Sequence, residues 1–269
     1  QTQTEAIPEE TAQTQTAAIP EKTAQIQTES DVTIIESGTC GAEGDGSNLR
    51  WELDSNGTLR ISGSGAMKDY AAWSSPWSGN NNRTTAITIA PGITKIGANA
   101  FYCFSSLTGE LTLPDSLTSI GEDAFARCGK LDSVTFQTGL TSIGNSAFYD
   151  CRSLTRITLP DSLTSIGNSA FQCCESLTSV TLPASLTSIG NSAYQVCTGL
   201  TSVTFPNSLT SIDYSAFSGC TSLTSVTLPA SLTRIGSSAF SGCTSLISVT
   251  FLDGLTSIDW GSGVFDGCT

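Results

Sequence analysis

The 269-residue sequence has no histidine, a single methionine and no glycine-rich phosphate loop. Without histidine, catalytic triads, metal sites and acid–base steps that depend on an imidazole are excluded. From residue 93 onward the carboxylates are scattered rather than paired at corresponding positions, and the exception, Glu122–Asp123, is interpreted as a solvated turn. We therefore predict no catalytic residue, no metal site and no cofactor.

Basic side chains and long apolar runs are scarce too. Eleven Lys and Arg stand against 24 Asp and Glu, which gives a formal net charge of −13, so a nucleic-acid backbone is not expected as a partner. No run approaches the roughly 18 apolar residues that a membrane span needs. No signal peptide is visible. The polar stretch from Gln1 is interpreted as the start of a mature secreted chain, the alternative being an arbitrary boundary.

One unit is repeated through most of the sequence, and Leu163–Ser185 (LTSIGNSAFQCCESLTSVTLPAS) is a typical copy. Its most regular residue, the key isoleucine, recurs every 23 or 24 residues, at Ile96, Ile120, Ile143, Ile166, Ile189, Ile212, Ile235 and Ile258. A fixed period in the twenties indicates a solenoid, in which each copy forms one coil and buries its apolar residues against the neighbouring coils.

The spacing within a copy predicts which residues are buried. Leu177, Val180 and Leu182 are expected to point into the core from a short strand, while Ser179 and Thr181 point outward. A proline after most of these strands ends the pairing, because proline has no N–H to donate. Leucine, isoleucine, alanine, phenylalanine and cysteine at fixed later positions are predicted to complete the core.

Six of the ten cysteines lie eight residues after a key isoleucine and form a cysteine column. They are Cys128, Cys151, Cys174, Cys197, Cys220 and Cys243. We interpret the column as buried small hydrophobic residues, with disulfides or a metal site within it as alternatives. The four off the column are Cys40, Cys103, Cys173 and Cys268. Cys103 and Cys173 share another position three coils apart, which is too far for a disulfide.

The chain before the repeats divides into two further parts. Residues 1–31 are of low complexity and are predicted to be a flexible tail or linker that can also extend as a strand. Residues 32–84 are predicted to cap the solenoid, which occupies residues 85–269. The cap contains an expected β-hairpin with Asn56-Gly57 in its turn, because this dipeptide supplies the positive φ that tight hairpin turns require.

The repeat pattern LPxSLTSIGxxAFxxCxSLTSV resembles the BspA-like class of bacterial leucine-rich repeats. The opening Gly38-Thr39-Cys40-Gly41 and the following W-x-L-D-x-x-G-T-L-x-I-S-G-x-G hairpin resemble the capping unit that precedes such repeats, so the resemblance covers about residues 38–269. It implies a right-handed leucine-rich-repeat solenoid of short parallel β-strands with turns and short helical segments. It also implies a role in extracellular attachment, and it transfers no catalytic residue.

Two groups of residues are candidate binding sites. The outward strand positions form an array of hydroxyls. They are interpreted as a surface that binds glycan or protein across the concave face, or that binds ice. The alternative is that they are good strand-forming residues that face solvent. They are Ser133, Thr135, Arg156, Thr158, Ser179, Thr181, Ser202, Thr204, Ser225 and Thr227. Tyr70, Trp73 and Trp77 in the cap are expected to cover the end of the core, with a sugar-stacking patch as the alternative.

The last copy carries two added residues and stops before its next strand. Trp260 and Phe265 are expected at an apolar end with an unpaired edge, to which Val32 and Ile34 of a second molecule can add as a strand; truncation of a longer protein is the alternative. We therefore predict a non-enzymatic secreted or cell-surface protein that binds an extracellular protein or glycan. The alternative function is a structural subunit that self-associates head to tail.

Overall fold

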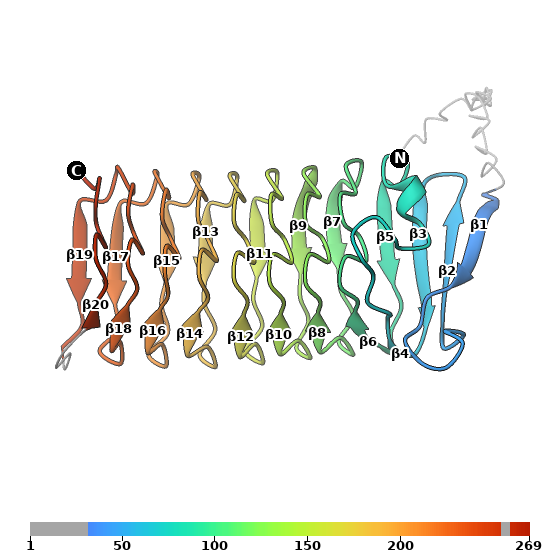
Figure 1. Cartoon of the computed structure of the whole chain (residues 1–269), viewed down its shortest axis with the longest axis horizontal. Coiled ribbons are helices and arrows are strands. Elements are labelled where there is room, and N and C mark those ends of the chain that lie inside the picture. The colour runs from blue at the N-terminus through green and yellow to red at the C-terminus, as the bar shows by residue number, and fades with distance from the viewer. Residues whose placement is uncertain (1–31, 254–258) are drawn as a thin grey trace, which may run out of the picture. The chain divides into compact units, whose positions relative to one another are not determined.

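Each copy of the repeat forms one coil of a parallel β-solenoid in the computed structural model, which describes residues 32–253 and 259–269 (Figure 1). A coil contains two strands, and the strands of successive coils pair in parallel with an offset of one repeat. Ser179 thus lies beside Ser202 in one sheet and Ile189 beside Ile212 in the other. The predicted repeat solenoid of short parallel strands is confirmed.

The two strands of a coil belong to two different sheets. The first sheet is built from β5 (Ala86–Ile89), β7 (Gly109–Thr112), β9 (Leu131–Thr135), β11 (Arg156–Thr158), β13 (Ser179–Thr181), β15 (Ser202–Thr204), β17 (Ser225–Leu228) and β19 (Ser248–Phe251). The second is built from β4 (Gly65–Ala66), β6 (Ile93–Ile96), β8 (Ser119–Ile120), β10 (Ser142–Ile143), β12 (Ser165–Ile166), β14 (Ser188–Ile189), β16 (Ser211–Ile212), β18 (Arg234–Ile235) and β20 (Asp259–Trp260). Hydrogen bonding in the first sheet is interrupted between β5 and β7, between β11 and β13 and between β15 and β17, and in the second between β12 and β14.

The core follows the repeat as predicted. In one coil Leu177, Val180 and Leu182 are buried from the first-sheet strand, and Leu186 and Ile189 are buried further along. No coil closes a core by itself, because its apolar side chains are covered only when the coils on either side pack against them. Stability therefore comes from contacts between neighbours.

A continuous stack of aromatic rings runs through this core. It consists of Trp77, Phe101, Phe125, Phe148, Phe171, Tyr194, Phe217, Phe240 and Phe265. Successive ring centroids lie 5.1–5.6 Å apart, close to the separation of neighbouring strands. The rings are within 20° of parallel, so each coil places its ring almost directly over the last.

The cysteine column is buried, as predicted, and its thiols are also hydrogen-bond donors. Each Sγ donates to the carbonyl oxygen of the core aromatic in the preceding coil, as Cys174 does to Phe148 (3.3 Å) and Cys197 to Phe171 (3.2 Å). Burial raises the pKa of Cys128 to about 12. All ten cysteines are free thiols. The column therefore links successive coils as well as filling the core.

The short helical segments that the resemblance implied are replaced by turns. Among the described residues, the helical element is one 3₁₀ turn in the cap, η1 (Ser78–Asn80). The stretch from the residue after the key isoleucine to the cysteine column, called the arc, contains two residues with positive φ in each coil. In the arc 144–151 these are Ser146 (52°) and Asp150 (60°). An L-residue in this region interrupts a right-handed helix, so the arc turns and bonds to the next coil instead.

The last coil has a different register from the predicted one. Trp260 of β20 pairs with Ile235, so Trp260 takes the position of the key isoleucine. The residue predicted for that position, Ile258, lies outside the described residues. The two added residues therefore precede Trp260, and the pattern is regular after them. Cys268 donates its thiol hydrogen to the carbonyl oxygen of Phe240 (3.2 Å) and belongs to the cysteine column, which corrects its assignment as an off-column residue.

The cap is an antiparallel unit that leads into the first sheet. β1 (Ile34–Thr39) pairs with β2 (Leu49–Asp54), and β2 pairs with β3 (Thr58–Gly63). β3 then pairs in parallel with β5, and Leu59 lies opposite Ile87. The predicted hairpin is therefore present and supplies the surface on which the first coil is laid.

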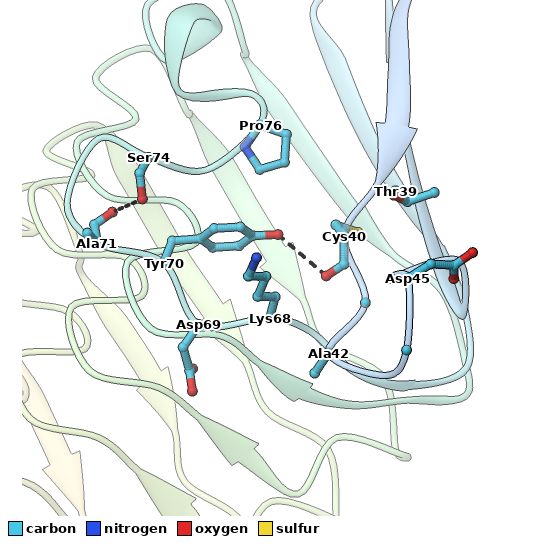
Figure 2. Close-up of a pocket in the computed structure, with 13 residues that line it drawn as sticks. Thr39, Cys40, Ala42, Asp45, Lys68, Asp69, Tyr70, Ala71, Ser74 and Pro76 are labelled. Atoms are coloured by element: carbon cyan, nitrogen blue, oxygen red, sulfur yellow. Dashed lines mark hydrogen bonds between the residues drawn. The ribbon is translucent and has the colours of Figure 1, made fainter.

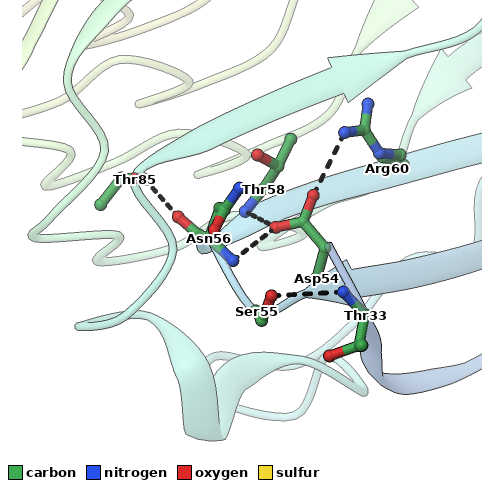
Figure 3. Close-up of polar contacts among 7 residues, drawn as sticks. All are labelled: Thr33, Asp54, Ser55, Asn56, Thr58, Arg60 and Thr85. Carbon is green, nitrogen blue, oxygen red and sulfur yellow. Dashed lines mark hydrogen bonds and ion pairs between the residues drawn. The ribbon is translucent and has the colours of Figure 1, made fainter. Parts of the chain in front are cut away.

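Asp54 organises the hairpin turn, and its side chain is almost fully buried (Figure 3). Its carboxylate accepts hydrogen bonds from the N–H groups of Asn56 (3.0 Å) and Thr58 (2.9 Å) and pairs with Arg60 (3.1 Å). Burial alone would raise the pKa of Asp54, but these donors together hold the pKa below its usual value. Gly57 has φ 81°, and a Cβ there would lie 2.5 Å from a backbone carbonyl oxygen.

Candidate binding surfaces

The outward side of the first sheet carries the predicted hydroxyl array, and we call it the hydroxyl face. Its members are Ser133, Thr135, Arg156, Thr158, Ser179, Thr181, Ser202, Thr204, Ser225 and Thr227. The two residues in β9 are half-buried and all the others are exposed. Strand pairing places equivalent residues of successive coils side by side, as it does Thr181 and Thr204, at the spacing of about 4.8 Å that separates neighbouring strands.

The hydroxyls of the hydroxyl face differ in their hydrogen bonding from the threonine hydroxyls that lie just before the strands. Thr201, just before β15, donates its hydroxyl to the carbonyl oxygen of Thr178 one coil earlier (3.0 Å). Thr164, just before β12, likewise donates to the carbonyl oxygen of Thr141 one coil earlier (3.1 Å). On the hydroxyl face, Thr135 donates to Glu110 (2.7 Å), and the remaining hydroxyls form no side-chain hydrogen bond with any described residue. These remaining hydroxyls are therefore available to a ligand, whereas the ladders before the strands tie the coils together.

A hollow of about 270 Å³ opens on the hydroxyl face where the hydrogen bonding between β11 and β13 is interrupted. Thr158, Ser179 and Thr181 line it with hydroxyls and Asp161 with a carboxylate, and the other lining residues are apolar. Small-molecule sites occupy about 300–1,000 Å³, so this hollow matches one sugar ring or one side chain. It combines donors, an acceptor and apolar surface within one small space.

A larger cavity of about 630 Å³ lies in the cap, where Thr39–Gly46 faces Lys68–Pro76 (Figure 2). Tyr70 forms one wall, and its hydroxyl donates to the carbonyl oxygen of Cys40 (3.4 Å). Burial raises the pKa of the Cys40 thiol to about 12 and also raises the pKa of the phenol, so both groups are neutral at physiological pH. The sequence interpretation missed this cavity; the available signal was three glycines within residues 41–46.

The three cap aromatics do not form one patch. Trp77 is fully buried, stacks on Phe101 at 5.5 Å and donates its indole N–H to a backbone carbonyl of the first coil (2.7 Å). Tyr70 meets Trp77 edge-on at 5.9 Å and lines the cap cavity. Trp73 is 53% exposed and contacts Tyr102 instead. Trp77 therefore extends the core, and Trp73 is the one ring of the three that is open to solvent.

The residues predicted for assembly lie at the two ends of the described solenoid. Val32, which precedes β1, and Ile34, the first residue of β1, are about half exposed, and the described partner of β1 is β2 alone. Trp260 is also about half exposed, while Phe265 is half-buried and stacks on Phe240 at 5.6 Å. Both ends thus present apolar side chains next to a strand that is paired on one side among the described residues.

In residues 32–253 and 259–269, no three Cys, Asp or Glu side chains are grouped so as to hold a metal ion. No helix in the same ranges has the length and apolar character needed to cross a bilayer.

Comparison with known proteins gives a family and a set of similar structures. The family model described as BspA type leucine rich repeat region matches residues 79–199 and 164–269, in six copies. A leucine rich cell surface protein from Faecalibacterium prausnitzii A2-165 is 32% identical, with 80% of this chain and 55% of that chain covered and a TM-score of 0.58. The T. pallidum leucine rich repeat protein TpLRR is 27% identical, with 76% and 91% covered and a TM-score of 0.58.

A leucine-rich repeat protein from Eubacterium ventriosum shows the same fold at 23% identity, with 87% of this chain and 76% of that chain covered and a TM-score of 0.51. The chain spans about half the length of the Faecalibacterium protein. The search of curated proteins finds no match.

Proposed function

The chain belongs to the BspA-type leucine-rich repeat family, and from this premise we propose that it is a non-enzymatic bacterial protein, secreted or on the cell surface, that binds an extracellular protein or glycan. The similarity to a leucine rich cell surface protein of Faecalibacterium prausnitzii supports the location. A repeat solenoid suits such a role, since it offers a long surface whose outward residues can change while the core columns stay constant.

The hollow on the hydroxyl face is the observation that carries this proposal. Its hydroxyls contribute nothing to the described hydrogen bonds within the protein, unlike the threonines just before each strand. Thr158 and Thr181 come from the neighbouring strands β11 and β13, whose ladder is interrupted, and both residues line the hollow. Asp161 adds a carboxylate that accepts hydrogen bonds from a sugar hydroxyl or an amide.

The test is a binding screen against purified extracellular proteins and a glycan array, followed by titration of the ligands found. The double variant Thr158→Val and Thr181→Val removes two hydroxyls in the hollow but keeps β-branched residues that suit a strand. The matched control, Thr204→Val and Thr227→Val, makes the same change on the same face outside the hollow. We expect the first pair to lose binding by about tenfold or more and the control to keep it. Equal binding by both would place the ligand elsewhere.

Head-to-tail self-association is a second candidate, supported by the exposed apolar residues at the two ends. Val32 and Ile34 stand beside one strand edge, and Trp260 stands at the other end of the described solenoid. A strand edge of this kind accepts a further strand, from another coil or from a second molecule. Light scattering at rising concentration distinguishes the two cases. We expect the full chain to form long assemblies that a chain lacking residues 1–36 does not form, and monomers from both would exclude this function.

A further inference from the structure

The arc of every coil holds a left-handed residue two positions after the core aromatic. In every coil before the last described one, its N–H donates to the next coil, as from Arg127 to the carbonyl oxygen of Tyr149 (2.6 Å), so contact between coils favours this conformation. Glycine adopts it freely, whereas other residues are destabilised by it. Three coils have glycine there, at Gly219, Gly242 and Gly267 (φ 72–75°). Five coils keep a side chain at φ 60–62°, at Cys103, Arg127, Asp150, Cys173 and Val196.

Arg127 is the member of this column whose side chain is exposed, and it forms no ion pair with the described residues. Its guanidinium lies over the ring of Tyr102, 5.9 Å from the ring centroid. Tyr102 in turn meets Trp73 edge-on, with 5.2 Å between ring centroids. Asp123 belongs to the same arc and is half-buried; burial raises its pKa and the nearby Arg127 lowers it, but the two side chains form no ion pair.

Trp73 is strained in the same way as Arg127. Its φ is 63°, its side chain is 53% exposed, and its carbonyl oxygen accepts a hydrogen bond from the Ser78 hydroxyl (2.9 Å) that helps to hold the loop. Two residues with unfavourable backbone conformations thus place an indole and a guanidinium each in contact with Tyr102. Glycine would relieve this strain at either position, so each side chain is kept at a cost in backbone energy.

We propose that Trp73, Tyr102 and Arg127 form a binding site for an acidic sugar, whose ring packs against the indole and whose carboxylate pairs with the guanidinium. The indole stands open on the surface, which suits a flat sugar face better than a peptide anchor, because such anchors fill desolvated pockets. The Arg127 guanidinium, which has no ion-pair partner among the described residues, selects an anionic group. The site is on the arc and in the cap, so it is separate from the hydroxyl face.

The test is calorimetric titration with trigalacturonate and with sialyllactose, using methyl-esterified trigalacturonate and lactose as neutral counterparts. We expect the wild-type chain to bind at least one acidic sugar about 10- to 100-fold more tightly than its neutral counterpart, the range that hydrogen bonds to charged groups provide. Arg127→Gly should lose this preference while melting at a higher temperature, because glycine relieves the left-handed strain. Loss of function with a gain of stability is a combination that a purely structural arginine would not give.

The matched control is Val196→Gly. It relieves the same backbone strain at the equivalent position three coils after Arg127. It should also melt higher, and it should bind the acidic sugar within about twofold of wild type, since it touches none of the three residues. Thr158→Val with Thr181→Val should bind the acidic sugar normally, which separates this site from the proposed function. The proposal is overturned if no acidic sugar binds, if the neutral counterparts bind equally, if Arg127→Gly binds normally, or if an acidic peptide binds in place of the sugars.

Discussion

Replacing Tyr194 with phenylalanine is expected to stabilise the solenoid. Tyr194 occupies a position in the aromatic stack that most coils fill with phenylalanine, and its ring lies 5.3 Å from both Phe171 and Phe217, at 10° and 4° from parallel. Its hydroxyl is buried and has no hydrogen-bond partner among the described residues. Burial also raises the pKa of the phenol well above its ordinary value of 10, so the group stays neutral without being paired.

The expected size of the effect follows from that hydroxyl. A buried polar group without a partner costs about 1–3 kcal/mol, and phenylalanine keeps the ring packing while removing the oxygen. We expect Tyr194→Phe to raise the free energy of unfolding by about 1–2 kcal/mol. For a chain of this size, the corresponding rise in melting temperature is about 2–6 °C.

Thermal unfolding followed by circular dichroism, with urea titration alongside, measures this change. The matched control is Phe217→Tyr, which places the same hydroxyl in the same stack one coil later and should lower the melting temperature by a similar amount. The reasoning is refuted if Tyr194→Phe melts lower than wild type. It is also refuted if Phe217→Tyr is neutral, because the stack would then accommodate a hydroxyl without cost.

Three further predictions concern the thiols and the cap. Cys197→Ala removes a buried thiol and its hydrogen bond, so urea titration should show a loss of about 1–2 kcal/mol, whereas Cys103→Ala, at a half-buried position, should be nearly neutral. In thiol labelling of the native protein, Cys103 should react at once and Cys197 only on unfolding, because burial denies access and raises the pKa of Cys197. Asp54 has its pKa below 3.8 in the folded state, so its stabilisation is present above about pH 4 and is lost as the pH falls through the lowered value. Melting curves at pH 7 and pH 3 should therefore differ more for wild type than for Asp54→Asn, and equal differences would contradict the role of this carboxylate.

The repeat made the core predictable. Leu177, Val180 and Ile189 were placed correctly because every coil must bury the same positions against its neighbours, so eight copies report on one geometry. The register of the last coil was wrong, because Ile258 fits the sequence pattern as well as Trp260 does, and strand pairing alone distinguishes them. The resemblance implied short helical segments, and the sequence does not reveal that the arc instead holds two residues with positive φ in each coil, many of which are not glycine.

The binding surfaces were harder to predict than the core. Thr201 and Thr204 are the same residue type and lie three residues apart in one coil. The hydroxyl of Thr201 nevertheless donates a hydrogen bond to the preceding coil, and that of Thr204 does not. This difference depends on the direction in which each side chain leaves its coil. Likewise, Trp73 and Trp77 were treated as a pair, but Trp77 completes the aromatic stack and Trp73 stands at the surface. Residues outside a repeat offer no second copy against which to check an interpretation.

The stacking of the coils has a mechanical consequence. The ladders of N–H groups, threonine hydroxyls and cysteine thiols all join one coil to the next, so they bear tension along the solenoid as links in series. A pull on the end of the chain itself, in contrast, acts on the outermost coil, which can peel away with its ring while the rings of the coils beneath it remain stacked. The protein is therefore built to yield under load in single steps and to re-form each step by laying one coil back on the next.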